Sequence, residues 1–132
     1  NITAGTKGAR GRHVDRWVPA SETAVACLVR AAALQGDGRN LIPPELSWRQ
    51  WNWRVHRVWS LARDSYGLEK IHDLRAAYAC ERYEQLTRSK APVIAGDRRV
   101  SRVDDHKARD VIALELGHAR RGVVAAYVGS SR

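Results

Sequence analysis

The chain has 132 residues, of which 23 are Lys or Arg and 14 are Asp or Glu, so its formal net charge is +9 and its pI is near 10.4. This length fits one ordinary domain. A composition with 44% hydrophobic residues allows a packed core and differs from that of a disordered chain. The charge favours a polyanionic partner, most often nucleic acid, although a merely solvated basic surface is the alternative.

The first nineteen residues predict a β-hairpin. Residues 2–4 and 13–18 alternate in the manner of strands on either side of a glycine-rich turn, residues 5–11. The glycines and basic residues of this turn leave backbone N–H groups and cations available to an anion. The expected fold is therefore mainly α-helical and belongs to the α+β class. It has a small β-hairpin at residues 1–19 and a helical body at residues 20–132.

The helical body is expected to be a single domain without repeats. Ser21 is a plausible N-cap for the first helix, and Gly117 is a plausible C-cap residue for the fourth. The expected helices are Glu22–Leu34, Glu45–Arg63, Glu69–Thr87, Lys107–Leu116 and Arg121–Tyr127. The polar, basic stretch Arg88–Val103 is expected to be a loop or a small hairpin.

Helical spacing predicts which faces of two helices are buried. The second helix has a stripe of Trp48, Trp51, Val55, Trp59 and Ala62, and the third has a stripe of Ile71, Leu74 and Tyr78. Such stripes are more often core than binding site. Trp53 lies on the other side of its helix, where it forms either a second packing face or a stacking surface; packing is favoured.

The compartment expected for this chain is a reducing cytoplasm. No apolar run approaches the roughly 20 residues that span a bilayer, and no signal-peptide pattern opens the chain. Cys27 and Cys80 are too few for a disulfide framework and sit among small apolar residues, as core cysteines do. Because the chain has no Met, Asn1 is not expected to be a natural start, and we expect a fragment.

Two segments contain residues that could perform chemistry. His72 and Arg75 are three positions apart and share one helix face, which is expected to point away from the core stripe into a surface cleft. Leu116-Gly117-His118 follows a helix stop, and Tyr127 comes nine residues after His118. The histidines lack paired spacing, and no Cys-x-x-Cys or glycine-rich nucleotide loop is present, so neither a metal nor a cofactor is expected.

In this order, with Lys7 in the upstream turn, the segments resemble the C-terminal catalytic domain of the tyrosine recombinases, the phage-integrase family. The resemblance covers nearly all of the chain. It implies a site-specific DNA recombinase that cuts and rejoins double-stranded DNA through a 3′-phosphotyrosine, for integration or excision of a mobile element or prophage. Tyr127 would be the nucleophile, Arg75, His72 and His118 would bind the phosphate, and Lys7 would be the general acid.

The other basic residues near these motifs are expected to grip DNA phosphates without reading sequence. They are Arg10, Arg12, Arg16, Arg120 and Arg121. The resemblance further implies a homotetramer on DNA for the full-length protein, in the bacterial cytoplasm at the nucleoid. This fragment is expected to be a monomer with little recombination activity.

Two departures from the family pattern are visible. The family has another essential arginine upstream of the hairpin, and this chain starts at the hairpin. We therefore expect the upstream part of the catalytic domain and any N-terminal DNA-binding domain to be absent from this fragment. The interval from Arg75 to His118 is 43 residues, longer than usual, and the stretch Arg88–Val103 accounts for the extra length. Two alternatives therefore stay open: a catalytically inactive DNA-binding module of the same fold, and a type IB topoisomerase-like enzyme.

Overall fold

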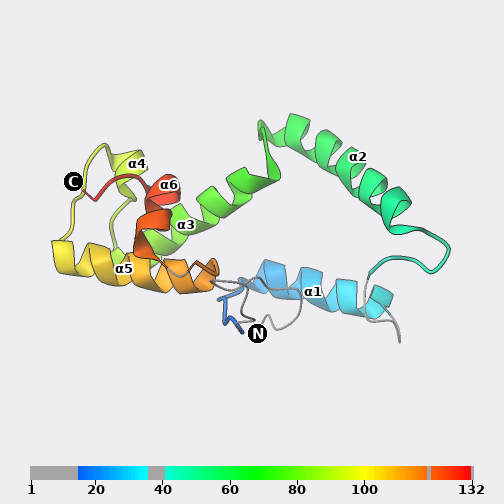
Figure 1. Cartoon of the computed structure of the whole chain (residues 1–132), viewed down its shortest axis with the longest axis horizontal. Coiled ribbons are helices and arrows are strands. Elements are labelled where there is room, and N and C mark those ends of the chain that lie inside the picture. Colours follow the sequence, from blue (N-terminus) through cyan, green and yellow to red (C-terminus); the bar gives the residue numbers. More distant parts are fainter. Residues whose placement is uncertain (1–14, 36–40, 119, 132) are drawn as a thin grey trace. The chain divides into compact units, whose positions relative to one another are not determined.

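The computed structural model describes residues 15–35, 41–118 and 120–131, and this part of the chain is helical (Figure 1). The α-helices are α1 (Glu22–Gln35), α2 (Trp48–Tyr66), α3 (Ile71–Thr87), α4 (Pro92–Ala95), α5 (Arg102–Glu115) and α6 (Ala125–Val128), and a 3-10 helix, η2 (Arg121–Val124), precedes α6. The mainly helical prediction is confirmed. The expected β-hairpin lies mostly outside the described residues, and residues 15–19 contain no strand of their own.

The chain divides into two compact units. One is Pro19–Glu69, which holds α1 and α2, and neither helix contains a buried residue. The expected burial of the α2 stripe is therefore wrong for the described residues: Trp48 is 67% exposed. Trp53 is also exposed, and the guanidinium of Arg57 lies 5.6 Å from the centre of its ring. The apolar stripe of an amphipathic helix is buried only where another element covers it. In this unit α1 does not cover the stripe of α2.

The boundaries of α2 follow from local chemistry. Ser47 and Gln50 form a capping box, in which the Ser47 hydroxyl accepts from the Gln50 backbone and the Gln50 side chain accepts from the Ser47 backbone. Gly67, at φ +64°, ends the helix in the left-handed conformation. These two signals set α2 three residues later at each end than periodicity alone predicted.

The other unit, formed by the chain up to Val18 and from Lys70 onward, contains the core. Helix α3 packs against α5 and α6, η2 packs against α5, and α4 packs against α6 (Figure 1). The buried apolar residues are Ala79, Tyr83, Ala91, Ala108, Ile112, Ala113, Leu116, Val124, Tyr127 and Val128. The core is therefore built from residues far apart in the chain, and it includes the expected nucleophile.

The buried face of α3 differs from the predicted one. Ile71 and Leu74 are about half exposed, whereas Ala79 and Tyr83 are fully buried. Position 72 lies seven and eleven residues before these two, which places His72 on the same side of the helix. The predicted core stripe was wrong, because small alanines let α3 approach α5 and α6 on this other side. His72 itself remains exposed, and Arg75 is partly buried.

Helix α5 starts earlier than predicted because Ser101 is its N-cap. The Ser101 hydroxyl accepts from the Asp104 backbone N–H and so satisfies one of the free donors at the start of the helix. Asp105 is instead fully buried on α5. Its carboxylate accepts from the Tyr83 hydroxyl at 2.8 Å and from the Arg109 Nε at 2.8 Å.

The chain after α6 is held by the same carboxylate. The Ser131 hydroxyl donates to Asp105 at 2.6 Å, and Arg109 donates to the Gly129 carbonyl at 2.9 Å. Gly129 has φ +87°, and a Cβ there would lie 2.7 Å from the Val93 backbone nitrogen, so a larger residue would be both strained and crowded. These contacts anchor the segment that directly follows Tyr127 to α4 and α5.

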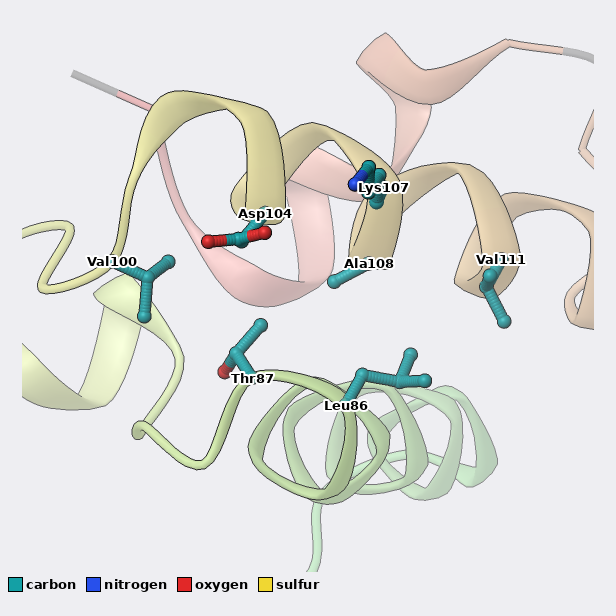
Figure 2. A pocket seen from close by; sticks show the side chains of 7 residues that line it. All are labelled: Leu86, Thr87, Val100, Asp104, Lys107, Ala108 and Val111. Atoms are coloured by element: carbon teal, nitrogen blue, oxygen red, sulfur yellow. The ribbon is translucent and has the colours of Figure 1, made fainter.

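The stretch Arg88–Val103, expected to be a loop or a small hairpin, contains the short helix α4, which begins at Pro92 after the buried Ala91. Where it returns toward α5 it borders a shallow hollow between the end of α3 and α5 (Figure 2). The hollow is lined by Leu86, Thr87, Val100, Asp104, Lys107, Ala108 and Val111.

No helix in the described part of the chain combines the length and the apolar composition that crossing a membrane requires. Cys27 is exposed, which contradicts the expectation of a core cysteine, and Cys80 is partly buried.

Candidate active site

The site is built around the turn that ends α5. Gly117 adopts φ +74°, and the backbone N–H groups of Gly117 and His118 donate to the carbonyls of Leu114 and Ala113 at 3.0 and 2.7 Å. This pair of bonds is the Schellman arrangement, which favours glycine at its left-handed position. The turn takes the chain out of α5 and sets the His118 ring beside α3 and α6.

Helix α3 contributes an arginine to this turn. The Arg75 Nη2 donates to the Leu116 carbonyl at 2.7 Å and lies 3.4 Å from the His118 Nε2. The first contact fixes the guanidinium against the end of α5, and the second places it next to the imidazole. Arg75 and His118 are 43 residues apart in sequence, so packing of α3 on α5 is what brings them together.

Helix α6 contributes the tyrosine. Tyr127 is 8% exposed, and its hydroxyl lies 3.3 Å from the His118 Nε2. Its ring stacks on the His118 ring with centres 5.8 Å apart, and the His72 ring is tilted against it by 41° with centres 5.5 Å apart. The structure thus brings together Arg75, His72, His118 and Tyr127, the four motif residues of the described chain.

The electrostatics of the site are dominated by positive charge. Burial lowers the pKa of His118 below its ordinary 6.5, and the nearby Arg75, Arg16 and His72 lower it further. His118 is therefore neutral at physiological pH. A neutral imidazole with an unprotonated Nε2 can accept a proton from the Tyr127 hydroxyl, whereas an imidazolium cannot.

This arrangement predicts the titration of His118. In the folded protein its ring should titrate below 6.5, and Arg75→Ala should move that pKa upward because a neighbouring positive charge is lost. An NMR titration of the histidine ring protons, with His118→Gln to assign the signal, measures both values. The pKa of His118 is lower in the folded chain than in the unfolded chain, so protonation of His118 opposes folding. The free energy of unfolding should therefore decrease as the pH falls below 6.5. A His118 pKa at or above 6.5 would contradict the described surroundings.

Arg16 also belongs to this site, although the sequence assigned it only to general DNA contact. Its guanidinium lies against Gly117, so close that a Cβ on Gly117 would collide with the Arg16 Nη1. The buried Nε of Arg16 has no hydrogen-bond partner among the described residues, and neither has the buried Nε of Arg75. Nothing in the local sequence signals this, because the contact joins the chain before Pro19 to the end of α5.

The other predicted DNA contacts fall into two groups. Arg10 and Arg12 lie outside the described residues, as does Lys7, the predicted general acid. Arg120 is exposed, and Arg121 makes a two-pronged ion pair with Asp110 at 2.6 and 2.7 Å. Arg121 is therefore already engaged by a carboxylate, unlike the guanidiniums at the turn.

The residues present can thus hold an oxyanion beside a tyrosine hydroxyl whose proton has an acceptor. In comparisons with known proteins, no family model, no curated protein and no solved structure matches this chain.

Proposed function

We propose that this chain is the catalytic part of a tyrosine recombinase, a site-specific integrase that cuts and rejoins DNA through a phosphotyrosine. The observation that supports this best is the contact of the Tyr127 hydroxyl with the His118 Nε2, which in turn lies beside Arg75. A tyrosine, a neutral imidazole and a guanidinium in this order suit phosphoryl transfer to a phenol.

In the proposed reaction the Tyr127 oxygen attacks phosphorus while its proton passes to the His118 Nε2. The new bond joins the tyrosine oxygen to the 3′ phosphate, and the bond to the 5′ oxygen breaks. That oxygen leaves as a 5′-hydroxyl after taking a proton, for which Lys7 is the candidate donor. The intermediate keeps the energy of the phosphodiester, so rejoining needs no external energy source.

Arg75 would bind the non-bridging oxygens as charge gathers on them. Its Nη2 donates to the Leu116 carbonyl, which orients the planar guanidinium and its forked pair of N–H donors in advance. Its buried Nε has no partner among the described residues. Electrostatic stabilisation of this kind is worth most where the donors are already in place before the reaction.

Arg75→Ala is therefore expected to slow covalent attachment by roughly two to three powers of ten. Arg75→Lys should recover only part of the rate, because an ammonium keeps the charge and loses the fork. Single-turnover rates on nicked DNA measure both variants, and circular dichroism checks that each is folded. A rate for the alanine variant within a factor of three of wild type would remove Arg75 from the site.

The experiment that tests the proposal is covalent trapping on nicked duplex DNA from the ends of the element that encodes the protein. The longest natural form of the chain is used, and the product is separated on a denaturing gel. A band of protein joined to the strand that carries the 3′ phosphate supports the proposal. DNA binding without any adduct favours the inactive DNA-binding module, and relaxation of supercoils without strand exchange favours the topoisomerase-like enzyme.

A further inference from the structure

Two guanidiniums, not one, lie at the turn Leu116-Gly117-His118. Arg75 reaches it from α3, with its Nη2 on the Leu116 carbonyl. Arg16 reaches it from the chain before α1, and the atoms nearest to the Gly117 Cβ direction are the Nη1, Cζ and Cδ of Arg16. A side chain at position 117 would therefore displace the Arg16 guanidinium from its place against the turn.

Neither guanidinium is neutralised within the described part of the chain. No ion pair joins Arg16 or Arg75 to a carboxylate there, and the buried Nε of each has no hydrogen-bond partner. The buried carboxylates of this unit are engaged elsewhere, Glu115 with Arg82 and Asp105 with Arg109. Two like charges at one turn, each with a buried Nε that lacks a partner, are costly unless an anion joins them.

The influence of Arg16 on His118 agrees with this placement. Arg16 is among the charges that lower the pKa of His118, as Arg75 is, so both lie within electrostatic reach of the imidazole that contacts Tyr127. A tetrahedral oxyanion beside the Tyr127 hydroxyl would lie within the same positive field.

We propose that Arg16 is a second phosphate-binding residue of this site and that it holds one DNA phosphate group together with Arg75. This rests on the proposed function for the identity of the phosphate, and on the geometry alone for the anion site. Two guanidinium forks on one phosphate would fix its orientation toward the Tyr127 hydroxyl before any bond changes. The same role for Arg10 or Arg12 is not implied, since those residues lie outside the described part of the chain.

The test uses inorganic sulfate as the probe, because it is a tetrahedral dianion that needs no DNA sequence. Sulfate is titrated into the full 132-residue chain at low ionic strength, and the His118 ring signals are followed by NMR. Wild type should show saturable shifts. Arg16→Gln, which keeps most of the side-chain stem and loses the charge, should weaken sulfate binding by roughly tenfold to a hundredfold. Arg16→Lys should restore part of the affinity.

Arg102→Ala is the matched control, because Arg102 is an exposed arginine of the same unit and its loss changes the net charge equally. It should bind sulfate as wild type does. Without sulfate, Arg16→Gln should also raise the pKa of His118, because a nearby positive charge is lost. If Arg16 lay far from His118, the substitution would leave this pKa unchanged.

The outcomes separate this inference from the proposed function. Sulfate binding that is unchanged in Arg16→Gln, or absent in wild type, overturns the role of Arg16 whether or not DNA adducts form. Sulfate binding that depends on Arg16 supports the anion site even if no DNA adduct forms, in which case only the proposed function fails.

Discussion

Tyr127→Phe should abolish covalent attachment to DNA and leave DNA binding intact. The substitution removes only the hydroxyl, which is the nucleophile in the proposed reaction, and the ring remains to fill the core beside Val124 and Val128. The lost contact with the His118 Nε2 is a single hydrogen bond, so stability should fall by only about 1 kcal/mol. A denaturing gel measures the adduct, and a mobility-shift assay measures binding.

Tyr66→Phe is the matched control for this substitution. Tyr66 is 79% exposed at the end of α2, and Tyr66→Phe removes a tyrosine hydroxyl that makes none of the contacts described for the site. It should form adducts at the wild-type rate. Adduct formation by Tyr127→Phe, or its loss in Tyr66→Phe, would contradict the assignment of the nucleophile.

Asp105→Ala should have the largest effect on stability of any single change considered, about 3–5 kcal/mol. Asp105 is fully buried, and its carboxylate accepts from Tyr83, Arg109 and Ser131. Without it, the guanidinium of Arg109, 2% exposed, would be left as an uncompensated buried charge. Urea unfolding followed by circular dichroism measures the loss as a shift of the midpoint.

A smaller change in the same network calibrates this result. Ser131→Ala removes one hydrogen bond to Asp105 and leaves the ion pair with Arg109, so its cost should be about 1 kcal/mol. Equal effects of the two substitutions would mean that Asp105 and Arg109 do not form the buried pair described. Because Asp105 also anchors the segment after Tyr127, Asp105→Ala should slow adduct formation even where the protein remains folded.

The sequence predicted where the longer helices lie, though not all of their ends, and it predicted their buried faces poorly. Helix positions follow from local signals, such as the Ser47 capping box and the left-handed Gly117, and both act within a few residues. Burial depends on which element covers a face. The Ile71 and Leu74 stripe was the more apolar side of α3, but small residues such as Ala79 let other helices approach, and that side became the core.

The site was predictable where it rests on motifs. Helical spacing placed His72 with Arg75, and the family resemblance paired His118 with Tyr127. Packing of α3 on α5 and α6 then joined the two pairs. Arg16 could be assigned only as one basic residue among several. Its contact with Gly117 joins positions about a hundred residues apart, and no periodicity or spacing rule relates such positions.

The central claim, that Tyr127 becomes covalently joined to DNA phosphate, is tested most directly by mapping the attachment site. Trapped adduct is digested with a protease and a nuclease, and the nucleotide-bearing peptide is sequenced by mass spectrometry. The account predicts a single modified peptide that contains Tyr127, with the nucleotide attached through its 3′ phosphate. Attachment at Tyr66, Tyr78 or Tyr83, at a serine, or through a 5′ phosphate would contradict it.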